Sequence, residues 1–128
     1  MKRLVLAAPL LGASHLVLAA GMPPAAHAES EALLARLAAS GCSFNRNGSW
    51  YDGAAARDHL QQKLNYLEGK GLVASTEQFI DRGASSSSMS GKAYLVRCGT
   101  GQPVESKAWL TVQLQALRSA PAPSPAKH

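Results

Sequence analysis

The sequence predicts a small α+β domain, mostly helical, with about four helices, a minor antiparallel sheet and one disulfide. Three observations indicate this fold class. Leucines recur at helical spacing in several segments, short alternating apolar and polar stretches surround Asn47-Gly48 and precede Cys98, and the chain has two cysteines, Cys42 and Cys98. The 128 residues are enough for one domain and few for two.

The first 28 residues have the pattern of a signal peptide. Two basic residues open the chain, the apolar run 4–20 follows, and Ala26-His27-Ala28 offers small residues at the two positions that a signal peptidase reads. We therefore expect cleavage near Ala28 and a periplasmic or secreted protein with no stable membrane span after processing. A membrane anchor is the alternative, but two prolines follow the run and no basic stop-transfer cluster comes after it.

Cleavage there leaves a single domain, residues 29–119, and a Pro/Ala-rich tail, residues 120–128, which has nothing to bury and is expected to be disordered. Loss of the two basic residues of the leader lowers the formal charge from +5 to +3. The remaining cations are scattered, so the sequence does not predict binding to nucleic acid. We expect a monomer whose partner is an envelope protein or a cell-wall component.

The two cysteines predict a disulfide, because an exported chain with an even cysteine count favours one. Closing the loop between Cys42 and Cys98 stabilises the fold by roughly 4 kcal/mol in the chain-entropy description. That is a large share of the about 5–15 kcal/mol typical of a domain. A redox or metal pair is the alternative, but no C-x-x-C is present and His59 is the only histidine in the expected domain, so we expect no metal and no cofactor.

Local signals place the elements of the first half. Ser30 is expected to cap a helix that ends near Ser40. Asn47-Gly48 predicts a hairpin between residues 42–46 and 49–51, because both residues accept a positive φ. An irregular loop of the same span is the alternative, since each arm is short.

The next segment reads as two helices. Asp52 is expected to cap the first, from about Gly53 to Glu68, whose buried stripe is formed by Ala56, Leu60, Leu64 and Leu67. Ser75 and Gln78 have the spacing of a capping box, which predicts a short helix ending near Gly83.

The last part is expected to contain a strand, a turn and a helix. Residues 92–98 alternate, and the disulfide would lay them beside residues 42–46. Residues 99–103 have the composition of a turn, and residues 106–117 fit an amphipathic helix. Residues 107–114 also fit a strand, so both assignments stay open.

Several patches between Phe44 and Val96, taken in order, resemble the YfeK family of exported bacterial proteins of uncharacterised function. The residues that carry the resemblance are Phe44, Arg46-Asn47-Gly48, Tyr51, Ala55, His59-Leu60, Lys63-Leu64, Thr76-Glu77-Gln78-Phe79-Ile80, Ala84-Ser85, Ser87-Ser88, Ser90-Gly91-Lys92 and Tyr94. The resemblance implies a periplasmic location and brings no catalytic residues.

The serine-rich segment 85–92 does not fit two well-known motifs. A phosphate-binding loop needs a glycine where Ser86 stands and Ser or Thr after Lys92. A serine–lysine acyl-enzyme needs a serine where Met89 stands. Two interpretations remain, a polar turn whose hydroxyls bind local backbone and a hydrogen-bonding surface for a glycan, peptide or partner loop.

The candidate binding residues share polar or aromatic side chains that the hairpin, the second helix and the serine segment would bring near one another. They are Arg46, Asn47, Tyr51, His59, Lys63, Ser85, Ser87, Ser88, Ser90, Lys92 and Tyr94. Arg, Tyr and hydroxyl groups suit recognition of a carboxylate or a sugar. The alternative is ordinary structure, with the tyrosines in the core and Arg46 in solvent.

Two classes of function follow. The first is a non-catalytic binding or interaction module of the cell envelope, with no catalytic residues. The alternative is a small periplasmic hydrolase that uses His59 with a loop serine or a water. It requires His59 to reach a hydroxyl of residues 85–90 with a carboxylate behind it.

Overall fold

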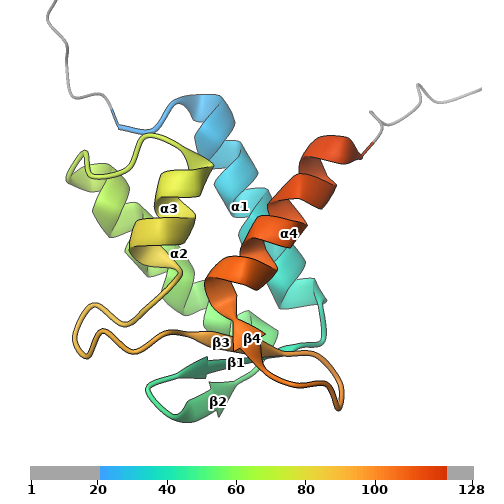
Figure 1. Cartoon of the computed structure of the whole chain (residues 1–128). Coiled ribbons are helices and arrows are strands. Elements are labelled where there is room, and N and C mark those ends of the chain that lie inside the picture. The colour runs from blue at the N-terminus through green and yellow to red at the C-terminus, as the bar shows by residue number, and fades with distance from the viewer. Residues whose placement is uncertain (1–20, 121–128) are drawn as a thin grey trace, which may run out of the picture.

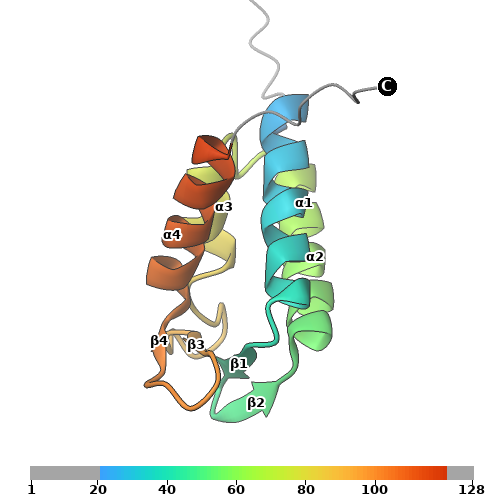
Figure 2. The same ribbon diagram turned by 90° about the vertical axis from the view of Figure 1, so that its right-hand side faces the viewer.

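The computed structural model describes residues 21–120, so the expectations for the apolar run 1–20 and for tail residues 121–128 lie outside the described residues. Four helices form most of this part: α1 (Pro24–Ala39), α2 (Gly53–Gly69), α3 (Thr76–Gly83) and α4 (Ser106–Ser119). They stand side by side, with α1 on α2 and α3 on α4, and the sheet lies across one end (Figures 1 and 2). The predicted α+β class is confirmed.

The sheet has four short strands in the described part of the chain: β1 (Ser43–Arg46), β2 (Ser49–Tyr51), β3 (Leu95–Arg97) and β4 (Val104–Glu105). Their order is β2-β1-β3-β4, and every pair is antiparallel. Asn47 and Gly48 connect β1 to β2 with φ angles of 53° and 87°. These positive values confirm the predicted hairpin and exclude the irregular loop.

The disulfide between Cys42 and Cys98 is confirmed, with a Cα–Cα distance of 4.2 Å. It joins the residue before β1 to the residue after β3, which lie side by side in the sheet. The strand expected over residues 92–98 is only partly formed, because regular pairing covers Leu95–Arg97 and Ala93 makes an isolated bridge to Ser86. β4 was not expected. It begins directly after the predicted turn 99–103 and pairs with β3.

Side-chain caps begin two of the helices as predicted. The Asp52 carboxylate accepts a hydrogen bond from the Ala55 backbone N–H at 2.8 Å, and Ser75 Oγ accepts from the Gln78 N–H at 3.1 Å. The second half of the capping box differs from expectation, because Gln78 Oε1 accepts from Ala74 rather than from Ser75. The open question over residues 107–114 is decided in favour of helix α4.

The expected start of the first helix at Ser30 was wrong. α1 begins at Pro24, a residue whose fixed φ suits the first helical position, and Ser30 is fully buried inside the helix. Its hydroxyl lies 3.4 Å from Thr76 Oγ1 instead of capping a terminus. The expected cleavage position near Ala28 therefore lies within α1.

The hydrophobic core fills the space between the helices and reaches the inner face of the sheet. Its fully buried large side chains include Leu33, Leu34, Leu37, Leu60, Leu64, Phe79, Leu110, Phe44, Val96 and Tyr94. α1 and α2 come close at Gly53, where an added Cβ would lie 2.5 Å from the Leu37 carbonyl oxygen. None of the helices within residues 21–120 combines the length and apolarity needed to cross a lipid bilayer.

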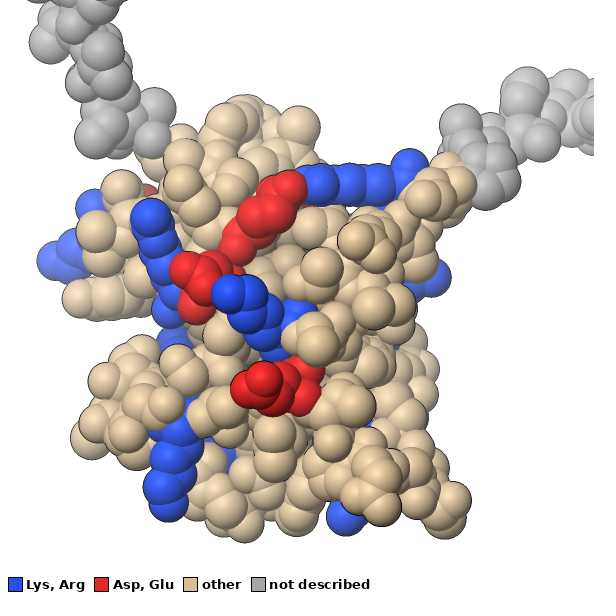
Figure 3. All heavy atoms as spheres, viewed as in Figure 1, with Lys and Arg blue, Asp and Glu red and all other residues tan. Residues whose placement is uncertain are grey.

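An ion-pair cluster connects three helices at the end opposite the sheet. The Arg118 guanidinium of α4 donates to the carboxylates of Glu29 in α1 and Glu77 in α3, at 2.8 Å each. Hydrogen bonds from Arg118 and Thr76 lower the pKa of Glu29 to about 2. Figure 3 shows the basic and acidic side chains interleaved over α3 and α4, so on this face the charges compensate one another.

A chain that starts at Glu29 should be less stable than one that starts at Gly21. The shorter chain lacks the first turn of α1, the buried side chain of Met22 and the 2.6 Å contact between His27 and Glu68. Burial of Met22 alone stabilises by about 1.5–3 kcal/mol. We expect thermal unfolding of the shorter chain at a temperature lower by about 6 °C or more, with Met22→Ala in the longer chain giving part of that loss. Equal melting temperatures would contradict the structural role of residues 21–28.

Candidate functional site

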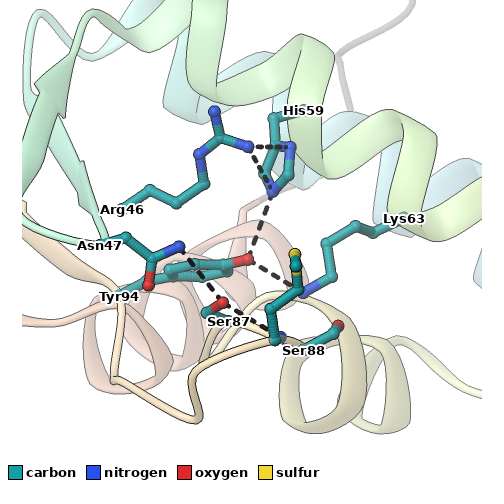
Figure 4. A pocket seen from close by; sticks show the side chains of 8 residues that line it. Arg46, Asn47, His59, Lys63, Ser87, Ser88 and Tyr94 are labelled. Atoms are coloured by element: carbon teal, nitrogen blue, oxygen red, sulfur yellow. Dashed lines mark hydrogen bonds between the residues drawn. The ribbon is translucent and has the colours of Figure 1, made fainter.

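A pocket of about 190 Å³ lies where the hairpin, α2 and the serine-rich segment meet. We call it the serine-loop pocket. Its lining residues are Arg46, Asn47, His59, Lys63, Ser87, Ser88, Met89 and Tyr94. Figure 4 shows the labelled side chains converging from three sides: Arg46 and Asn47 from the hairpin, His59 and Lys63 from α2, and the serines from their loop.

The fold brings these side chains together for local reasons. His59 and Lys63 are four residues apart in α2 and therefore lie on one face of that helix. Arg46 is the last residue of β1, on the same side of the sheet as Phe44, because side chains two apart in a strand share a face. The Asn47-Gly48 turn then carries Asn47 next to the serine-rich segment.

Arg46 and His59 make the shortest contact between two residues that line the pocket. Arg46 Nη1 lies 2.8 Å from His59 Nδ1 and 3.3 Å from Nε2. The second guanidinium nitrogen donates to the hydroxyl of Tyr51 at 3.4 Å, and the guanidinium carbon lies 4.9 Å from the centre of the Tyr51 ring. Tyr51 therefore contacts Arg46 from outside the pocket and is not one of its lining residues.

Tyr94 forms the floor of the pocket. Its ring is 2% exposed and packs against Phe44 with a centroid distance of 5.0 Å. Its hydroxyl receives a hydrogen bond from Lys63 Nζ at 3.0 Å and lies 3.3 Å from His59 Nε2. Lys63 Nζ also donates to the Ser86 carbonyl at 3.0 Å, so it is held between the loop and the ring.

Ser87 organises the serine loop. Its buried hydroxyl oxygen accepts from the backbone N–H groups of Met89 and Ser90, at 3.2 Å each. It also accepts from Asn47 Nδ2 at 3.3 Å, while Asn47 Oδ1 accepts from the Ser90 hydroxyl at 2.6 Å. Asn47 thereby ties the hairpin turn to the loop, and the polar-turn interpretation describes Ser87 and Ser90 well.

The eleven candidate binding residues fall into three groups. Those that line the pocket are Arg46, Asn47, His59, Lys63, Ser87, Ser88 and Tyr94. Tyr51 and Ser90 support lining residues from outside. The side chains of Ser85 and Lys92 do neither: the Ser85 hydroxyl donates to the carbonyl of Ile80 within α3, and Lys92 is exposed. Their backbone carbonyls accept from the N–H groups of Tyr94 and Ser87, at 2.9 Å each.

Met89 was not among the candidates, although its side chain lines the pocket and is 97% exposed. The sequence feature that could have pointed to Met89 is that it is a single large apolar residue within a run of serines.

The pocket is electropositive, because Arg46 and Lys63 line it and no carboxylate is among its lining residues. Burial, followed by the charges of Arg46 and Lys63, lowers the pKa of His59 below its ordinary value of 6.5. Burial and the charge of Arg46 also lower the pKa of Lys63. Burial raises the pKa of Tyr94, so its hydroxyl keeps its proton.

The geometry required for a hydrolase is not formed around His59. Its hydrogen-bonding contacts in the described structure are with Arg46 and Tyr94, and a loop serine is not among them. The group behind the imidazole is the Arg46 cation, where a triad has a carboxylate. Within residues 21–120, no three His, Cys, Asp or Glu side chains are grouped to hold a metal ion.

Comparison with known proteins identifies a family. Residues 24–118 match the DUF5329 family, which is described as a family of unknown function. The chain belongs to the DUF5329 family. Its matched region starts at Pro24, the first residue of α1, and ends within α4. The YfeK resemblance remains a prediction, since the family that matches is DUF5329. No match was found among curated proteins or among solved structures.

His59 should make the stability of the fold depend on pH. The unfolded chain protonates His59 as the pH falls through about 6.5, whereas the folded chain does so only at lower pH. The free energy of unfolding should therefore decrease as the pH falls below about 6.5. Urea unfolding between about pH 5 and pH 8 should show that His59→Gln removes this decrease.

The matched control is His27→Gln. The carboxylate of Glu68 raises the pKa of His27, so its contribution is present below about 6.5 and is lost as the pH rises through its folded-state value. The two variants should change the pH profile with opposite signs. A profile that His59→Gln leaves unchanged would contradict the uncharged state assigned to His59.

Proposed function

We propose that this DUF5329 protein is a non-catalytic binding module of the cell envelope that takes its ligand in the serine-loop pocket. The observation that carries the proposal is the convergence of Arg46, Lys63 and Tyr94 with the serine loop around one cavity. Polar groups that converge on a preformed hollow are typical of a ligand site.

The proposed location rests on the N-terminal sequence. Basic residues, the apolar run 4–20 and small residues after it are the pattern of an export signal. The disulfide agrees with this location, because oxidising compartments outside the cytoplasm preserve such bonds. The YfeK-like character of the chain, which implies the periplasm, belongs to the same proposal.

A binding role accounts for the surroundings of His59 better than hydrolysis does. A general base must accept a proton from the nucleophile or from water, and its efficiency depends on a free acceptor nitrogen. In this pocket Arg46 Nη1 lies 2.8 Å from Nδ1 and 3.3 Å from Nε2 of the imidazole, and the Tyr94 hydroxyl lies 3.3 Å from Nε2. His59 therefore acts as a spacer that holds Arg46 and Tyr94 in place.

A pocket-blocking variant tests the proposal. Ser88 lines the pocket, is exposed, and is not among the residues whose side chains form the hydrogen bonds of the loop. Ser88→Trp should fill the pocket and leave the fold intact. Capture of an envelope protein or cell-wall fragment by crosslinking in an envelope extract should occur with the wild-type protein and be lost with Ser88→Trp.

The matched control is Thr100→Trp. Thr100 is exposed in the turn after β3, which lies away from the serine loop in Figure 1. This variant adds the same apolar surface at a distance from the pocket and should retain the captured molecule. Equal capture by both tryptophan variants would place binding outside the pocket, and capture by neither the wild type nor the control would argue against a binding module.

A further inference from the structure

The groups around His59 include two hydrogen-bond donors with fixed roles. A guanidinium has N–H donors and no acceptor, and Arg46 Nη1 lies 2.8 Å from His59 Nδ1 and 3.3 Å from Nε2. The Tyr94 hydroxyl lies 3.3 Å from the same Nε2. The imidazole therefore stands between the Arg46 cation and the hydroxyl that contacts the Lys63 ammonium.

Lys63 has a fixed role at the hydroxyl of Tyr94. An ammonium is also a donor without an acceptor, so Lys63 Nζ donates to Tyr94 Oη at 3.0 Å. The hydroxyl faces the pocket, and its other contact is His59 Nε2 at 3.3 Å (Figure 4). Tyr94 therefore holds the Lys63 ammonium at the pocket.

The other groups of the pocket add donors. Two N–H bonds of Lys63 go to Tyr94 and to the Ser86 carbonyl, which leaves the third for a ligand. Ser87 Oγ already accepts three hydrogen bonds, so its own O–H proton is its remaining capacity. Within residues 21–120 the Ser88 hydroxyl makes no hydrogen bond, so it can donate to a ligand or accept from one.

A second hollow differs from the serine-loop pocket because its charged side chains are paired. It lies between α3 and α4, has a volume of about 290 Å³, and is lined by residues that include Asp81 and Lys107. These two side chains form an ion pair at 2.9 Å, so the charges at that hollow compensate each other. In the serine-loop pocket, Arg46 and Lys63 form no ion pair with any carboxylate of residues 21–120.

We infer that the serine-loop pocket binds an anion through carboxylate or phosphate oxygens, with Arg46 and Lys63 as the charged donors and the Tyr94 hydroxyl holding Lys63 in place. This inference rests on the proposed function and names the ligand class of the same site. An oxyanion has only acceptors, so it complements a pocket whose free groups are donors, and its charge offsets that of Arg46 and Lys63. A neutral ligand would leave both cations without a counter-charge.

The test is a titration of the purified, disulfide-bonded protein with three small probes, followed by two-dimensional NMR. The probes are inorganic phosphate, acetate and acetamide, the last being the uncharged counterpart of acetate. Signals of His59, Lys63 and Ser88 should shift in a saturable manner with at least one anion and not with acetamide. Tighter binding of phosphate or of acetate decides which oxyanion the pocket prefers.

Two lysine variants separate the pocket from general charge effects. Lys63→Met removes the ammonium but keeps the length of the side chain, and should weaken anion binding by about tenfold or more. Lys70→Met removes the same charge from an exposed lysine at the end of α2, whose ammonium lies 5.9 Å from the Tyr66 ring. It should bind the anions as tightly as the wild type.

Tyr94→Phe provides a second check, because it keeps the buried ring and removes only the hydroxyl. It should also weaken binding of the preferred anion. The inference is overturned if acetamide binds as well as acetate, if neither anion gives saturable shifts, or if Lys63→Met binds as tightly as Lys70→Met. In any of these cases, capture of a partner that Ser88→Trp abolishes would still support the binding module, with an uncharged ligand.

Discussion

The position of Tyr94 joins the hydrophobic core of this protein to its pocket. The ring is buried against Phe44, while the hydroxyl at its end meets Lys63 and His59. A buried hydroxyl needs hydrogen-bond partners, so burial of the Tyr94 ring requires polar side chains next to its hydroxyl. The Tyr94 hydroxyl holds Lys63 directly, and Arg46 is held by His59, which lies next to that hydroxyl. The pocket therefore forms as a consequence of how the core is packed.

The disulfide and the hairpin support this arrangement from the side of the sheet. Cys42 and Cys98 fasten β1 to β3, and Phe44 of β1 pairs with Val96 of β3. Asn47, at the turn, binds both Ser87 and Ser90. The hairpin is therefore connected to β3 by one covalent bond and a β-ladder, and to the serine loop by a pair of side-chain hydrogen bonds.

Features with a local cause were predictable from the sequence. The Asn47-Gly48 hairpin, the caps at Asp52 and Ser75 and the pairing of two cysteines each depend on a few neighbouring residues or on a count. β4 was not predictable, since two residues carry no periodicity and their pairing depends on β3. The start of α1 was misplaced because Ser30 is a good capping residue that tertiary packing buries instead.

In the candidate site, too, features with a local cause were predictable and features that depend on tertiary packing were not. His59 and Lys63 could be grouped from their spacing in one helix, and the serine loop from its composition. Their chemistry could not be derived in that way, because it depends on distances between segments far apart in the chain. Arg46 lies 2.8 Å from His59, where the alternative hydrolase would require a carboxylate. That single contact changes the interpretation of the histidine from a base to a spacer.

The state of His59 is the most direct test of this account, and nitrogen-15 NMR of the imidazole ring measures it. At pH 6.5, where an ordinary histidine is half protonated, the account predicts a mostly neutral ring, because burial and the charges of Arg46 and Lys63 lower the pKa of His59. This result would support an electropositive pocket suited to an anion. A ring that is half charged or more at that pH would contradict the electropositive surroundings on which the account depends.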